Sequence, residues 1–355
     1  MIHPLSTGLG SRETRRVGQA AVSLLFWALG LAVMFGPFLR DRDAADSEGN
    51  DPGRLVSETD RPFGEQLEEF DAEFDADLTG ALAVAEELYL SEGSEMLEGL
   101  IDFSRLESGE RAYEMHCTGC HGSTADGAGP AARHLDPRPR AIAKGVFKFT
   151  STATGEPPLR EDLFQTLTRG LAGSSMPDFR LLSSELRWDM VEYVRYIAMR
   201  GAFRRLVLEI AQDDEEVPDE EDMLEYAEIV LEAWSPQYLK PVFPPITEPE
   251  YDEDSVERGR EVFTDTSGAN CSSCHGVTGI GDGPSSGDFR DDWGYPIVPR
   301  DLTTGVFRAG NSSADIYRSI MTGINGTPMP SYGSSIPPED IWALVHYIQS
   351  LGVAR

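Results

Sequence analysis

Two pentapeptides in this chain of 355 residues contain all four of its cysteines, and each pentapeptide ends in histidine. The pattern Cys-x-x-Cys-His is typical of covalent haem attachment. Two thiols on one turn of chain add to the two vinyl groups of a haem, and the histidine that follows lies under the ring as an iron ligand. The sequence therefore predicts two covalently bound haem c groups. The residues concerned are, in chain order, Cys117, Cys120, His121, Cys271, Cys274 and His275.

Two other functions are known for paired cysteines. Four thiolates can bind one zinc ion, and a single pair can act as a redox-active dithiol. Neither function requires a histidine directly after the second cysteine of both pairs. The two motifs are also far apart, because His275 follows His121 by 154 residues. Haem attachment explains both features of the sequence.

A methionine lies at nearly the same distance after each motif histidine. Met176 follows His121 by 55 residues, and Met329 follows His275 by 54 residues. Methionine usually fills gaps in a hydrophobic core. Here, however, each methionine lies in a loop flanked by glycine and proline, and the loop occurs twice in register. We therefore expect the thioether of each methionine to be the second axial ligand of each iron.

Two further histidines compete for this role. His134 follows the first attachment motif, and His346 lies near the C-terminus. Neither has a histidine at the matching place in the other half of the chain. We expect each of them to be a surface or packing residue.

The register between the two halves extends well beyond the ligands, which predicts an internal duplication. Two copies of one haem-binding domain are therefore expected. The matching residues include Gly122, Gly127, Gly129 and Pro130 with Gly276, Gly281, Gly283 and Pro284, then Pro139 and Arg140 with Pro299 and Arg300, and Trp188, Val191 and Tyr193 with Trp342, Val345 and Tyr347.

With these motifs, each half resembles a class I cytochrome c domain, and the whole chain resembles a membrane-anchored dihaem cytochrome c. The resemblance covers about residues 105–201 and 251–355. It implies a mainly α fold, in which a helix that carries a glycine and an aromatic residue crosses a C-terminal helix beside the haem cleft. The matching segments are Gly109 with Tyr113 and Gly259 with Phe263 for the first helix, and residues 187–199 and 338–351 for the second.

The resemblance also suggests roles for residues around each haem. It implies that the carbonyl oxygens of Pro130 and Pro284 accept a hydrogen bond from the far nitrogen of the motif histidine, which would fix the ring. Arg140 and Arg300 are candidates for pairing with haem propionates, because a guanidinium binds a carboxylate through two parallel hydrogen bonds. A turn-forming proline and a solvated arginine are the alternative interpretations.

The N-terminal segment predicts a membrane anchor. Residues 20–39 are apolar and uncharged, and a helix of this length spans the hydrocarbon core of a bilayer. Arg12, Arg15 and Arg16 precede it, and positive residues stay on the cytoplasmic side. We therefore expect a single-pass anchor in a bacterial cytoplasmic membrane, with both haem domains in the periplasm. A cleavable signal peptide is the alternative, but its shorter apolar core and small-residue cleavage site are not evident.

Acidic and proline-rich segments separate these parts. The segment after the anchor reads as an acidic tether that ends in an amphipathic helix at about residues 81–103, and a second short helix is expected at about 223–234. The expected organisation is an anchor at 1–40, a linker with an amphipathic helix at 41–104, the first haem domain at 105–201, a linker with a short helix at 202–250 and the second haem domain at 251–355.

The charge of the chain constrains its partners. The formal net charge is -31, so nucleic acid is excluded as a ligand because like charges repel. We expect a redox protein with a basic docking surface, or a place within a membrane respiratory complex. A generally acidic exported surface is the alternative explanation of the charge.

These features together predict an electron carrier without catalysis of its own, since the redox chemistry belongs to the haem. The carrier would connect a membrane redox complex with a periplasmic partner, or form a subunit of such a complex. A dihaem cytochrome c peroxidase is the alternative, because it also has two attachment motifs. That enzyme needs an open or displaceable position on one iron, and the paired methionine loops argue against it.

Overall fold

Helices supply the regular structure of the region that the computed structural model describes, residues 72–91 and 94–353. Buried apolar side chains form two separate cores, one within residues 78–234 and the other within residues 262–348. Each of the two predicted haem-binding halves therefore has a hydrophobic core of its own. The expected mainly α fold is therefore confirmed for this region.

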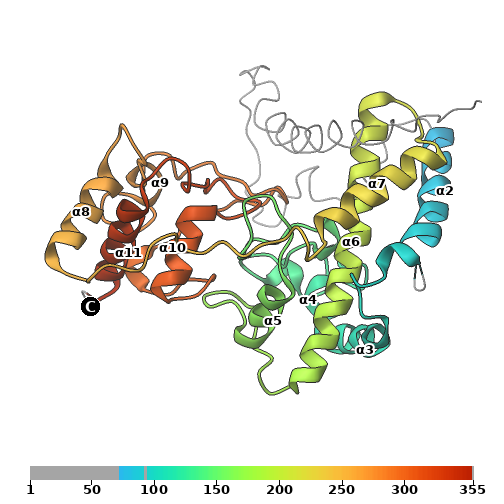
Figure 1. The fold of residues 1–355 in the computed structure, drawn as a ribbon, viewed down its shortest axis with the longest axis horizontal. Helices are drawn as coiled ribbons and strands as arrows, with labels where there is room; N and C mark the ends of the chain where they lie inside the picture. Colours follow the sequence, from blue (N-terminus) through green and yellow to red (C-terminus); the bar gives the residue numbers. More distant parts are fainter. Residues whose placement is uncertain (1–71, 92–93, 354–355) are drawn as a thin grey trace, which may run out of the picture. The chain divides into compact units, whose positions relative to one another are not determined.

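Each core is organised by one helix crossing. In the first domain α3 (Leu106–His116) crosses α6 (Ser184–Asp214), and in the second α8 (Glu253–Thr264) crosses α11 (Pro338–Val353). Figure 1 shows α8 beside α11 and α3 beside the lower part of α6. The shorter elements are η2 (Glu95–Leu97), η3 (Phe103–Arg105), α4 (Thr118–His121), η4 (Ala132–His134), η5 (Ile142–Lys144), α5 (Arg160–Arg169), α9 (Ser272–His275), η6 (Leu302–Thr304) and α10 (Ser313–Thr322).

A glycine allows the two helices of each crossing to touch. A Cβ atom on Gly109 would lie 2.2 Å from the carbonyl oxygen of Asp189, and one on Gly259 would lie 2.0 Å from that of Ala343. Any larger residue would force the helices apart. The glycine positions that the resemblance implied for the first helix of each domain are thus the positions of closest backbone approach.

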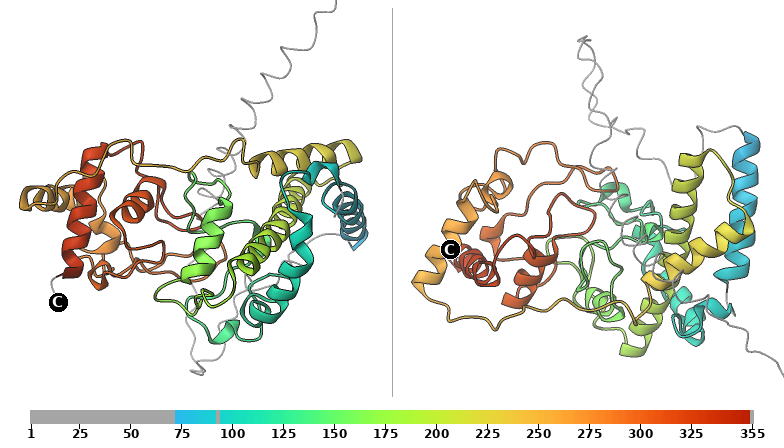
Figure 2. Two further views of the ribbon diagram at one scale, coloured as in Figure 1. Left: turned by 60° about the horizontal axis from the view of Figure 1, so that its bottom comes forward. Right: turned by 45° about the horizontal axis from the view of Figure 1, so that its top comes forward.

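A helical cap, formed by α2 (Ala72–Tyr89) and α7 (Glu220–Ala233), packs on α6. Figure 2 shows the three helices together from two sides. Ion pairs to one buried carboxylate join α2 to α6, since Glu86 accepts hydrogen bonds from Arg200 at 2.9 Å and from Arg204 at 2.9 and 3.1 Å. A buried carboxylate needs such partners, because removing one of them leaves an uncompensated charge.

The cap agrees in part with the helices that the sequence predicted. The short helix expected near residues 223–234 is confirmed as α7. The amphipathic helix expected at 81–103 begins and ends earlier, as α2, and its buried stripe is formed by Leu78, Leu82 and Ala85. Leu88 lies outside that stripe and is 52% exposed.

The second domain contains an insertion relative to the first. The segment between the two matched prolines spans 284–299 in the second domain and 130–139 in the first, a difference of six residues. Within it, residues 289–297 fold back on themselves as a small turn that we call the inserted hairpin. The backbone N–H of Ile297 donates to the carbonyl of Phe289 at 2.9 Å, which closes the hairpin.

None of the helices in residues 72–91 and 94–353 combines the length and the apolar character needed to cross a membrane. The predicted anchor at 1–40 lies outside the described residues, and so does the acidic segment up to residue 71. Both therefore stay predictions from the sequence.

Candidate haem-binding sites

Each attachment motif folds into a single turn of helix, α4 in the first domain and α9 in the second. The backbone N–H of His121 donates to the carbonyl of Cys117 at 2.8 Å, and that of His275 donates to the carbonyl of Cys271 at 2.9 Å. This turn brings both thiols and the imidazole of a motif close together. All four cysteines are free, as covalent attachment to haem requires.

A backbone carbonyl fixes the orientation of each motif histidine. Nδ1 of His121 lies 2.9 Å from the carbonyl oxygen of Arg140, and Nδ1 of His275 lies 3.1 Å from that of Arg300. A carbonyl can only accept, so Nδ1 carries the proton in both rings and Nε2 keeps a lone pair for a metal. Burial lowers the pKa of both histidines, against the opposing effect of the hydrogen bond. The neutral imidazole that iron binds is thereby favoured.

The acceptors are thus arginine carbonyls, and not the carbonyls of Pro130 and Pro284 that the resemblance implied. Both prolines are exposed. The backbone on each side of Pro130 is bonded to the attachment turn instead, since the N–H of Gly129 donates to the carbonyl of Cys120 at 3.2 Å.

The methionine loops have the same hydrogen bonding in both domains. The carbonyl of Met176 accepts from the N–H of Leu171 at 3.2 Å, and the N–H of Met176 donates to the hydroxyl of Ser174 at 3.2 Å. The corresponding bonds at Met329 measure 3.1 and 3.2 Å. The sequence match between the loops is therefore also a match in structure.

A glycine in a left-handed conformation ends the helix before each loop. Gly170 has φ +65°, and Gly323 has φ +68°. A Cβ atom at either position would lie 2.7 Å from the carbonyl oxygen of the loop methionine. Only glycine takes this conformation without strain and leaves room for the loop. The glycine therefore determines where the methionine lies.

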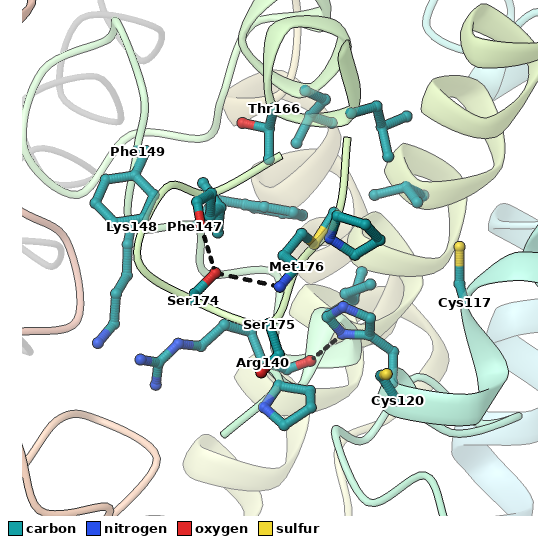
Figure 3. Close-up of a pocket in the computed structure, with 18 of the residues that line it drawn as sticks. Cys117, Cys120, Arg140, Phe147, Lys148, Phe149, Thr166, Ser174, Ser175 and Met176 are labelled. Atoms are coloured by element: carbon teal, nitrogen blue, oxygen red, sulfur yellow. Dashed lines mark hydrogen bonds between the residues drawn. The ribbon is translucent and has the colours of Figure 1, made fainter. Parts of the chain in front are cut away.

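A cavity in the first domain brings the predicted ligands together. Cys117, Cys120, His121 and Met176 all line it. Figure 3 shows Met176 within the cavity, with both cysteines on one side and Phe147, Lys148 and Phe149 on the other. Apolar side chains supply much of the remaining lining, among them Tyr113, Leu135, Ile142, Val146, Leu163, Leu167, Leu171, Phe179, Val191 and Val194.

These residues fit a haem. The thiols suit its vinyl groups, the imidazole and the thioether suit its iron, and the apolar lining suits its ring. Burial raises the pKa of Cys117 to about 12 and that of Cys271 to about 11. Among the described residues, no group of three or more histidine, cysteine, aspartate or glutamate side chains is arranged to hold a metal ion.

The two arginines expected near the propionates have protein partners. The guanidinium of Arg140, which lines the first cavity, forms an ion pair with Asp291 of the inserted hairpin. Nε and Nη2 of Arg300 donate to the carbonyl of Val306 at 2.9 and 2.7 Å. Their pairing with propionates stays a prediction.

Three basic residues of the first cavity were not predicted, Arg138, Lys148 and Arg308, and the last two occupy matching positions of the two domains. Lys148 is buried beside it, and Arg308 reaches it from the second domain. The sequence contained a signal that could have identified Lys148 and Arg308, since each directly follows one copy of the matched Gly-Val-Phe segment. Their placement at one cavity depends on how the domains pack, which the sequence pattern does not indicate.

The competing histidines have the roles expected for them. His134 is exposed and accepts a hydrogen bond from Arg133. His346 is buried, with Nδ1 2.8 Å from the hydroxyl of Ser255 on α8. Neither lines the first cavity.

Both domains match known families. Residues 104–194 match the family described as cytochrome c oxidase, cbb3-type, subunit III, and residues 256–352 match the family described as cytochrome c. The chain is also 31% identical over 101 residues to the Cbb3-type cytochrome c oxidase subunit FixP of Azorhizobium caulinodans. That match covers 28% of this chain and 29% of FixP, so it spans less than a third of the relative.

A solved structure resembles a larger part of the chain. It is the Kuenenia stuttgartiensis reducing HAO-like protein complex Kustc0457/Kustc0458, with 32% sequence identity and a TM-score of 0.53. The match covers 69% of this chain and 96% of the chain in that complex.

Proposed function

We propose that this chain, which belongs to the c-type cytochromes and carries two covalent haem c groups in its two cytochrome c domains, transfers electrons outside the cytoplasmic membrane. It would receive electrons from, or deliver them to, a membrane redox complex and exchange them with a periplasmic partner. The observation that carries the proposal is the repeated arrangement of motif histidine and methionine loop, with matching hydrogen bonds in both domains.

The proposed axial ligands are His121 with Met176 and His275 with Met329. Bound haem supplies one-electron chemistry, and the thioether of methionine raises the potential of its iron. The protein orients each imidazole through an arginine carbonyl and holds the proton on Nδ1, and in the first domain apolar side chains would lie around the haem ring. A methionine that ligates each iron would leave no open position for peroxide, which favours electron transfer over peroxidase activity.

The proposed setting is a larger redox assembly. FixP is by name a subunit of a cytochrome c oxidase, and the matched solved chain belongs to a protein complex. The acidic charge of this chain suits a partner with a basic docking surface. The apolar segment at 20–39 would anchor the chain so that both domains face the periplasm.

A redox titration with two controls tests this function. The full-length chain should take up two electrons, one per haem, and return them to a mediator without loss. The reduced protein should bind carbon monoxide poorly and turn over little peroxide. Rapid carbon monoxide binding together with efficient peroxide reduction by the unmodified chain would instead identify a peroxidase.

A further inference from the structure

Equivalent basic residues of the two domains meet beside the first haem cavity. Arg140 and Lys148 of the first domain correspond to Arg300 and Arg308 of the second, at a constant offset of 160 residues. Lys148 and Arg308 are two of the residues that line the cavity. Basic residues are half as numerous as acidic ones in this chain, 30 against 61. A cluster of four is therefore not the result of a generally basic surface.

The inserted hairpin holds the first-domain pair of this cluster. The carboxylate of Asp291 is 2% exposed and accepts hydrogen bonds from Arg140 and, at 3.1 Å, from Lys148. The Trp293 ring centre lies 4.6 Å from the guanidinium carbon of Arg140 and 5.3 Å from the ammonium of Lys148. Such cation–π contacts strengthen when they are desolvated. The six-residue insertion thus joins the two domains at the cavity.

Arg308 of the second domain makes a further contact with the first domain. Its Nη2 donates at 3.3 Å to the carbonyl of Gly173, in the loop that carries Met176. Its Nε is buried and has no hydrogen-bond partner among the described residues. Burial lowers the pKa of Arg308, and the nearby charges of Arg300 and Arg140 lower it further. Arg308 is therefore a half-buried cation whose buried Nε–H lacks an acceptor in the described part of the chain, and the nearby charge of Asp136 acts on its pKa in the opposite direction.

We propose that Arg308 binds a propionate carboxylate of the first haem, so that a residue of the second domain completes the haem site of the first. The inserted hairpin positions it by holding the domains together. This inference rests on the proposed function and deepens it, because the potential of the first haem then depends on the second domain.

The chemistry of the ligand follows from the charges. A buried N–H of a guanidinium needs an acceptor, and Asp291 already accepts from two basic groups and from the backbone N–H groups of Trp293 and Tyr295. A haem carries two carboxylates, and its predicted cavity is the one that Arg308 lines. A cation beside the ring favours the less positive, reduced iron. Loss of Arg308 should therefore lower the potential of the first haem.

Substitution of Arg308 tests the proposal in the full-length holoprotein. Arg308→Gln should lower the midpoint potential of the first haem and leave the second nearly unchanged, with the haem methyl signals in nuclear magnetic resonance following each haem separately. Arg308→Lys keeps the charge and should restore most of the loss. Arg318→Gln is the matched control, since it removes one charge from the same domain at a residue that does not line the cavity.

A spectroscopic readout separates haem binding from a general loss of structure. Resonance Raman bands of the propionate groups should shift in Arg308→Gln and return in Arg308→Lys. Unchanged propionate bands and potentials in Arg308→Gln would overturn the inference, and so would equal shifts of both haems. In either case two reversible haems in the unmodified chain would leave the proposed function intact.

The role of the hairpin is tested in the same way. Trp293→Ala should weaken the contact between the domains and raise the radius of gyration in small-angle X-ray scattering. It should also lower the midpoint potential of the first haem, as Arg308→Gln does. Trp293→Phe keeps an aromatic ring for Arg140 and should resemble the unmodified chain. If the potential of the first haem falls after Arg308→Gln but not after Trp293→Ala, Arg308 remains the proposed propionate ligand and the hairpin does not position it.

Discussion

The carbonyl oxygen of Arg140 accepts a hydrogen bond of 2.9 Å from Nδ1 of His121. The side chain of the same arginine lies over Trp293 and pairs with Asp291, which both belong to the other domain. One residue therefore orients the predicted iron ligand of the first haem and contacts the insertion of the second domain. The two cytochrome c domains therefore contact each other at the residue that orients this predicted ligand, and not only through their linker.

The first prediction concerns the number of haems. Replacing Cys117 and Cys120 together by serine should lower the haem content from two per chain to one, because the first domain then has no thiol to attach a haem. The matched variant with Cys271 and Cys274 replaced should lower it by the same amount. The ratio of haem to protein after denaturing electrophoresis measures both. An unchanged ratio in either variant would contradict the assignment.

The second prediction concerns the methionine ligands. Met176→Ala should open the first iron and Met329→Ala the second, since each loop offers one thioether at the same place. In each variant carbon monoxide binding should rise to about one per chain, and the potential of one haem should fall, because thioether ligation favours ferrous iron. A variant that keeps both potentials and still excludes carbon monoxide would show that another group ligates that iron.

Much of the haem site followed from the sequence, because its chemistry is local. The attachment turn needs only five consecutive residues. At the helix crossings and before the methionine loops, the backbone leaves no room for any residue larger than glycine. Matching positions in the two halves then gave pairs such as Met176 and Met329. Local steric requirements of this kind are visible in a single sequence.

The parts that the sequence did not predict depend on contacts between residues that are far apart in the chain. The acceptor for His121 is a backbone carbonyl, which every residue offers, so residue type could not distinguish Arg140 from Pro130. The inserted hairpin is visible as a difference in length, but nothing in its sequence indicates that Asp291 packs on the other domain. The ion pairs of Glu86 with two arginines of α6 join segments more than 100 residues apart, which no local pattern indicates.

The third prediction concerns the N-terminal anchor. Membranes washed with concentrated salt should retain the full-length chain, because an apolar helix is held by the hydrophobic effect and not by screened charges. A chain that starts at Asp41 behind a cleavable export signal should instead be soluble and carry both haems. Release of the full-length chain by salt would exclude the anchor.

The fourth prediction concerns docking. With a net charge of -31, association with a basic redox partner should slow steeply as ionic strength rises, since exposed charges are screened beyond about 10 Å at 0.1 M salt. Stopped-flow measurement of electron transfer to the partner gives this dependence. A rate that does not change with salt would indicate a permanent complex or an apolar docking surface.

The last prediction concerns the helix crossings. Gly109→Ala should destabilise the first domain by about 2 kcal/mol, because overpacking a tight contact typically costs about 1–3 kcal/mol and the new Cβ would lie 2.2 Å from a backbone oxygen of α6. Gly80→Ala is the control, since nothing lies within 4 Å of a Cβ at this position in α2. That change should stabilise the protein by about 0.5–1 kcal/mol, the ordinary gain of alanine over glycine in a helix. Thermal unfolding followed by circular dichroism compares the two variants. If Gly109→Ala unfolds at the same temperature as the unmodified chain, α3 and α6 do not cross as closely as the structure places them.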